Sequence, residues 1–145
     1  MARPKAVYFD ASALVKRYVE EEHSDTVRRW LRSEICATSR LTEIEVASAL
    51  ARRCHEGAFS AADRDHVTGV LSRDLQGYIF RVELTPAVVR RGLGILHRHS
   101  LRAADALQLA SALELREHLG SHVILVAFDD RLCRAAELED LAVSG

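Results

Sequence analysis

Four acidic residues, far apart in the chain, each lie where an apolar run gives way to a helix-forming segment. They are Asp10, Glu45, Asp105 and Asp129. If the chain folds as a parallel sheet, such side chains meet in the crevice at the carboxyl ends of the strands. Two carboxylates about 4 Å apart repel by roughly 4 kcal/mol at an effective dielectric near 20, and a cation relieves this repulsion. An all-oxygen site selects Mg²⁺ or Mn²⁺, ions that activate water for phosphodiester cleavage.

Each acid also has a structural interpretation. Glu45 can complete a capping box, Asp105 can be a first-turn acid favoured by the helix dipole, and Asp129 can be the N-cap of the last helix. Asp10 is the hardest to explain in this way. Ser12 already offers an N-cap there, and an Asp that ends a buried strand is costly to desolvate. The metal-site hypothesis therefore depends on the four acids taken together.

The elements that must position these acids alternate between strands and helices. Short apolar runs predict strands at residues 6–9, 35–38, 78–82, 123–127 and 141–143. Capping signals predict helices that start at Ser12, around residue 25, at Thr42 and at Ser60. The helix from Thr42 should end near residue 56, before Gly57, and the helix from Ser60 at Gly77. Further helices are predicted over residues 86–99, 102–118, which Gly120 closes, and 132–138. This order predicts one α/β domain over residues 1–145, with a parallel, helix-covered sheet.

Composition is that of an ordinary soluble domain. The hydrophobic fraction is 48% and the charged fraction 28%, and no apolar run approaches the roughly 20 residues of a membrane span. The opening MARPKAVYFD has too short an apolar run to be a signal peptide. Three cysteines without metal-ligand spacing indicate structural thiols in the cytoplasm. A net charge of −1 does not indicate a nucleic-acid binder, and solvated helix faces explain most of the arginine clusters.

An ordered set of motifs carries a family resemblance. It consists of DASALVK at residues 10–16, SRLT at 39–42 leading to EVASAL at 45–50, LRAADALQLA at 101–110, and FDDRL at 128–132. The set resembles the PIN-domain ribonucleases, and most of all the VapC-type toxins of bacterial toxin–antitoxin pairs. It covers nearly the whole chain in the order that the family has.

The resemblance implies a three-layer α/β/α fold with a short, mostly parallel sheet, and RNA cleavage that depends on Mg²⁺ or Mn²⁺. It places the family's acids on Asp10, Glu45, Asp105 and Asp129, and makes Ser12 a supporting polar partner. The less favoured alternatives are Glu43 for the second acid and Asp130 for the fourth. One departure is Ala127, where family members often carry Thr or Ser; this removes one hydrogen bond around the metal.

The resemblance also implies partners: an RNA substrate, a VapB-type antitoxin and a second copy of the chain, with the apolar faces of the early helices as candidate surfaces. Arg102, one turn before Asp105, is expected either to steer the RNA backbone or to pair with a site carboxylate. The alternative function is a catalytically silent module that binds RNA or a protein partner. A haloacid-dehalogenase-like phosphatase is disfavoured because Ser12 stands where its second Asp belongs. A response-regulator receiver is also disfavoured, because this chain lacks the acidic pair and the late Lys of that class.

Overall fold

The computed structural model describes residues 6–144, which contain a five-stranded sheet in the order β3-β2-β1-β4-β5. Every neighbouring pair of strands is parallel. The strands are β1 (Ala6–Phe9), β2 (Ile35–Ser39), β3 (Ile79–Val82), β4 (Val123–Val126) and β5 (Ala142–Ser144). The predicted domain also includes residues 1–5 and 145, and the opening segment that was compared with a signal peptide includes residues 1–5. Both stretches lie outside the described residues.

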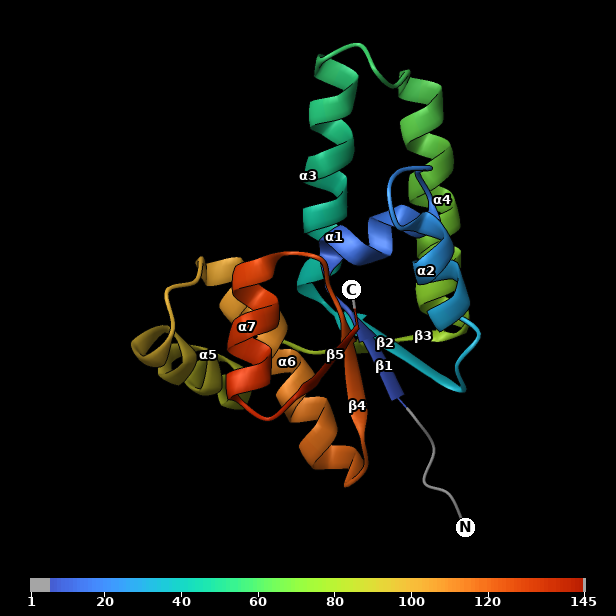
Figure 1. The fold of residues 1–145 in the computed structure, drawn as a ribbon. Coiled ribbons are helices and arrows are strands. Elements are labelled where there is room, and N and C mark those ends of the chain that lie inside the picture. Colours follow the sequence, from blue (N-terminus) through green and yellow to red (C-terminus); the bar gives the residue numbers. More distant parts are fainter. Residues whose placement is uncertain (1–5, 145) are drawn as a thin grey trace.

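Helices connect the strands and cover both faces of the sheet (Figure 1). They are α1 (Ala11–Leu14), the 3-10 helix η1 (Val15–Arg17), α2 (Ser24–Trp30), α3 (Leu41–His55), α4 (Ala61–Gly77), α5 (Pro86–Arg98), α6 (Ala103–Leu119) and α7 (Asp130–Leu138). The elements α1 to α4 contribute to one core layer, and α5 to α7 to the other. This arrangement confirms the predicted three-layer α/β/α class.

The central strand β1 is buried on both faces, as its continuous apolar sequence predicts. All four of its residues are 0% exposed. Because side chains alternate across a strand, Tyr8 packs in the layer of α5, α6 and α7, and Phe9 in the layer of α1 to α4. Strand β1 lies between β2 and β4, so its buried end is held on both sides.

Helix boundaries follow the predicted signals at several places. Ser60 caps α4 in a capping box with Asp63, and Thr85 caps α5. Gly57 (φ 76°) and Gly120 (φ 57°) adopt the left-handed conformation that glycine allows after α3 and α6.

Two predicted N-caps are wrong. Asp10, not Ser12, caps the first helix, because its carboxylate accepts a hydrogen bond from the N–H of Ala13. Thr42 does not open α3: the chain turns into the helix already at Leu41, and no side chain caps it. The Thr42 hydroxyl is instead buried in hydrogen bonds to other elements.

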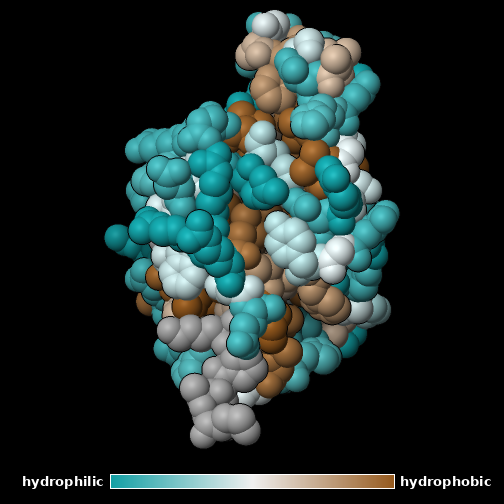
Figure 2. Space-filling view, turned by 90° about the vertical axis from the view of Figure 1, so that its right-hand side faces the viewer, coloured by the Kyte–Doolittle hydropathy of each residue, from teal (hydrophilic) through white to brown (hydrophobic). Residues whose placement is uncertain are grey.

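The helices α3 and α4 form a hairpin that projects beyond the sheet (Figure 1). Figure 2 views the side of the molecule where α2 and α4 lie, and shows a strip of apolar atoms between hydrophilic margins below the hairpin tip. Among residues 6–144, no helix combines the length and apolar character needed to cross a membrane.

Candidate active site

The candidate site lies where the strand order reverses. From β1 the chain proceeds outward to β2 and β3, and then returns to place β4 and β5 on the opposite side. Asp10 directly follows β1, and Asp129 follows β4, the strand beside it. Glu45 lies in the second turn of α3, and Asp105 in the first turn of α6. The charge effects described below couple Asp105 to Asp10, to Glu45 and to Asp129.

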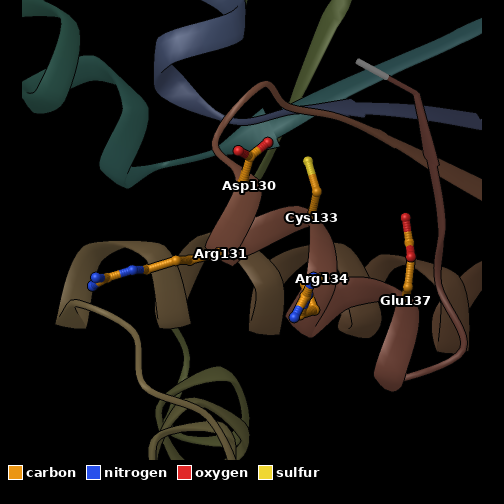
Figure 3. A pocket seen from close by; sticks show the side chains of 5 residues that line it. All are labelled: Asp130, Arg131, Cys133, Arg134 and Glu137. Carbon is orange, nitrogen blue, oxygen red and sulfur yellow. The ribbon is translucent and has the colours of Figure 1, made fainter.

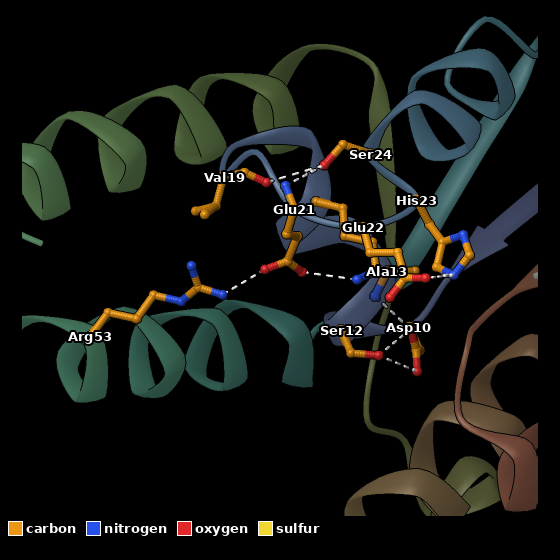
Figure 4. Close-up of polar contacts among 10 residues, drawn as sticks. Asp10, Ser12, Ala13, Val19, Glu21, Glu22, His23, Ser24 and Arg53 are labelled. Atoms are coloured by element: carbon orange, nitrogen blue, oxygen red, sulfur yellow. Dashed lines mark hydrogen bonds and ion pairs between the residues drawn. The ribbon is translucent and has the colours of Figure 1, made fainter. Parts of the chain in front are cut away.

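Asp10 is the most buried of the four acids, at 4% exposure. Its Oδ1 accepts the N–H of Ala13 at 2.8 Å, and the Ser12 hydroxyl lies 3.1 Å from both of its carboxylate oxygens (Figure 4). The pKa of Asp10 is raised to about 7. Burial is the largest cause and the charges of Asp105 and Glu45 add to it, while the two hydrogen bonds act in the opposite direction. The protein thus holds a carboxyl group in a place that disfavours its ionised form.

Glu45 is half-buried and faces the same region. Its Oε1 accepts a hydrogen bond from Gln108 Nε2 at 2.8 Å. Burial raises the pKa of Glu45, the Gln108 amide lowers it, and the charge of Asp105 raises it. Glu43 lies elsewhere, because its carboxylate accepts hydrogen bonds from Arg40 at 3.0 Å and from Arg81 at 2.7 Å. The geometry therefore favours Glu45 over Glu43 as the second acid.

The charge of Asp105 raises the pKa of Asp10 and of Glu45, and Asp105 is itself affected by Asp129. Burial raises its pKa, the charge of Asp129 raises it further, and the charge of Arg102 lowers it. Asp129 caps α7, since its Oδ1 accepts the N–H of Leu132 at 2.9 Å. Asp130 is the first residue of α7 and has no comparable effect on Asp105. Of the two candidates for the fourth acid, Asp129 is thus the one coupled to the cluster.

A hollow of about 410 Å³ lies along α7, lined by Asp130, Arg131, Cys133, Arg134 and Glu137. Figure 3 shows Asp130, Cys133 and Glu137 on one side of α7, with Arg131 extending away from this group. Burial raises the pKa of Cys133 to about 11, and the nearby charges of Asp10 and Asp129 contribute to this shift. The hollow is lined by residues of α7, the first of which, Asp130, directly follows Asp129 in the sequence.

The chemistry of the cluster fits a hard divalent cation. Its four carboxylates offer oxygen ligands, as Mg²⁺ and Mn²⁺ prefer. In the described part of the chain, no three Asp, Glu, His or Cys side chains surround one point closely enough to bind an ion together. Carboxylates brought to about 4 Å from each other repel by roughly 4 kcal/mol at an effective dielectric near 20. A cation that neutralises the acids would draw them together.

The inward-facing Gln108 was missed by the sequence reasoning, which assigned only apolar residues of this helix to the core. Gln108 is 1% exposed and contacts Tyr8, Thr42 and Glu45. A signal for it existed: Gln108 follows Asp105 by three positions, so both lie on one face of α6 within an otherwise apolar stretch.

Fold and site together define an α/β/α protein with buried and half-buried acidic residues near its topological switch point. Residues 7–138 match the sequence profile of the PIN domain. The chain is 33% identical to Ribonuclease VapC46 of Mycobacterium tuberculosis over 138 residues, which cover 95% of both proteins. It is 36% identical to Ribonuclease VapC45 of the same species over 131 residues, covering 86% of this chain and 84% of the relative.

Solved structures agree on the fold. The toxin VapC20 of M. tuberculosis, described as cleaving the sarcin-ricin loop, superposes with a TM-score of 0.66 at 18% identity, over 90% of this chain and 95% of that one. A toxin–antitoxin complex from Klebsiella pneumoniae gives a TM-score of 0.64 at 16% identity, over 88% and 90%. The chain belongs to the PIN-domain family, and its sequence relatives are VapC proteins, which confirms the resemblance.

Proposed function

We propose that this PIN-domain protein is a VapC-type toxin: an endoribonuclease that hydrolyses RNA phosphodiester bonds with the help of Mg²⁺ or Mn²⁺. Two lines of evidence support this function. The sequence relatives with 33% and 36% identity are named ribonucleases. The single structural observation that carries the proposal is the Asp10 carboxylate, which is 4% exposed at the end of β1 and whose pKa the charges of Asp105 and Glu45 raise.

In this proposal Asp10, Glu45 and Asp105 hold the cation, and Asp129 completes its environment or helps to hold a second ion. A bound Mg²⁺ or Mn²⁺ activates water as the nucleophile and neutralises charge on the phosphate. Asp10 must be ionised to bind a cation, and the hydrogen bonds from Ser12 and Ala13 favour that form.

Cationic side chains beside the acids suit the RNA backbone. Arg102 is exposed and lies close enough to Asp105 to lower the pKa of that carboxyl group. Arg131 and Arg134 line the hollow along α7, and their guanidinium groups form no hydrogen bond or ion pair with any described residue. Guanidinium groups bind phosphate oxygens in a bidentate manner. We therefore assign Arg102 first, with Arg131 and Arg134 beyond it, to the phosphates that flank the scissile bond.

The expected protein partners are a VapB-type antitoxin and a second copy of the chain, and we place the protein in the cytoplasm. The similar K. pneumoniae structure is a toxin–antitoxin complex, and an acidic crevice attracts a basic inhibitory segment. The apolar strip on the side of α2 and α4 (Figure 2) is the candidate surface for the second copy. The free cysteines Cys36, Cys54 and Cys133 are compatible with a reducing compartment.

The test is RNA cleavage by the purified protein with Mg²⁺ or Mn²⁺, beside an Asp105→Asn variant and a chelator control. We expect discrete cuts by the parent alone, with 5′-phosphate and 3′-hydroxyl product ends. Equal cutting by the Asp105→Asn variant would point to a contaminating nuclease. If no metal supports cutting, the protein is instead a silent module that binds RNA or a protein partner.

A further inference from the structure

A buried network of polar side chains lies directly behind the acidic crevice. At its centre is Gln108, which is 1% exposed. Its Oε1 accepts the hydroxyl of Tyr8 at 2.5 Å. Its Nε2 donates to Thr42 Oγ1 at 3.1 Å and to Glu45 Oε1 at 2.8 Å. One buried amide thus joins β1, α3 and α6, and reaches one of the four acids.

The orientation of this amide follows from the donors around it. Thr38 is 0% exposed, and its hydroxyl donates to the carbonyl of Phe9 at 2.7 Å. Thr38 Oγ1 also lies 2.7 Å from Thr42 Oγ1. Since a hydroxyl has one proton, and that of Thr38 goes to Phe9, Thr42 must donate to Thr38. Thr42 can then only accept from Gln108, so the amide nitrogen has to face Thr42 and Glu45.

A flipped amide is disfavoured on both sides. It would place the carbonyl oxygen of Gln108 against the Glu45 carboxylate and against lone pairs of Thr42, with no proton between them. Leaving buried polar atoms unpaired is energetically costly. The Tyr8 hydroxyl, by donating to the opposite end of the amide, reinforces the same orientation.

We propose that Gln108 is a positioning residue that holds the Glu45 carboxylate in the crevice, with its own orientation set by Tyr8 and by the Thr38–Thr42 pair. This inference rests on the proposed function, in which Glu45 contributes to the cation site. The chain of hydrogen bonds begins at the carbonyl of Phe9, one residue before Asp10. It therefore fixes Glu45 relative to the strand end that carries Asp10.

The test measures the dissociation constant for Mn²⁺ by calorimetry, together with thermal unfolding in the presence of chelator. Gln108→Met keeps the length of the side chain but removes both donors, and should weaken Mn²⁺ binding by about 10-fold or more, as loss of an outer-shell partner does. Tyr8→Phe should weaken binding less, because the Thr42 contact still favours the correct amide orientation.

Tyr18→Phe is the matched control. The Tyr18 hydroxyl also donates a hydrogen bond to a partly buried partner, Asp74, at 2.7 Å. Tyr18→Phe should thus lower the unfolding temperature while leaving Mn²⁺ affinity unchanged. A double variant separates positioning from general damage: in a Glu45→Gln background, Gln108→Met should cause no further loss of affinity.

Two results would overturn the inference alone: Gln108→Met binds Mn²⁺ as tightly as the parent, or it weakens binding equally in the Glu45→Gln background. If Gln108→Met does not fold, Tyr8→Phe decides, and unchanged affinity there refutes the role of Gln108. If the parent itself binds no Mn²⁺, the metal-dependent function fails and the inference fails with it.

Discussion

Replacing Asp10 by Asn should stabilise the protein in the absence of divalent cations, and the gain should grow with pH. The pKa of Asp10 is about 7 in the folded protein, against an ordinary value of 3.8. Below pH 3.8 both states are protonated and the group has no effect. Between pH 3.8 and 7 only the unfolded chain ionises, so the native state loses stability as pH rises.

The magnitude follows from the width of this interval. At about 1.4 kcal/mol per pKa unit, the burial of Asp10 disfavours the native state by roughly 4 kcal/mol above pH 7, and by roughly 1 to 2 kcal/mol at pH 5. Asn cannot ionise and is as good an N-cap as Asp, so the start of α1 is kept. The advantage of Asp10→Asn over the parent should therefore increase by roughly 2–3 kcal/mol from pH 5 to pH 8.

Urea denaturation at the two pH values, with chelator present, measures this difference from the midpoint at constant slope. Mn²⁺ should reduce this advantage at pH 8, because it stabilises only the protein that binds it, by about 2.7 kcal/mol at 100 times the dissociation constant. An advantage that does not change between pH 5 and pH 8, or a destabilised Asp10→Asn variant at pH 8, would refute the reasoning.

Three further variants test neighbouring parts of the structure. Glu45→Gln should abolish RNA cleavage, while Glu43→Gln, which loses only an exposed ion-pair network, should cut at the parent rate; equal effects in a cleavage assay would contradict the assignment. Ser12→Ala removes a hydroxyl that favours ionised Asp10, so the rise of cleavage rate with pH should move to higher pH, and an unmoved profile would argue against this contact. Leu109→Ala in the core should lower the free energy of unfolding by about 2–5 kcal/mol in denaturant melts, and a smaller loss would mean that the core repacks.

Much of the architecture is predictable because its signals are local. The apolar run before Asp10 predicts a strand buried on both faces, and the runs around the other strands behave in the same way. Ser60 and Gly120 mark helix ends by chemistry that operates within a few residues. The placement of the four acids at one sheet edge follows from the parallel topology once the strands are recognised.

Two of the errors concern side chains whose partners belong to other elements. Thr42 has the right type for a cap, but β2 turns into α3 one residue earlier, and its hydroxyl bonds to Thr38 and Gln108 instead. Gln108 could not be assigned to the core by periodicity, because an amide is buried only when other elements supply its partners. Those partners lie up to 100 positions away in the sequence.

Two acids of the proposed cation site also hold the backbone with the same carboxylate. In Asp10 and Asp129, Oδ1 accepts the N–H of the third following residue and begins a helix. An amide or a hydroxyl at these places can still cap the helix, whereas Ala cannot. Gene copies that lose toxicity but still yield a foldable product are therefore expected to arise through Asn or Ser at these positions. Such copies would retain the shape of the toxin, and could compete with it for a shared inhibitor.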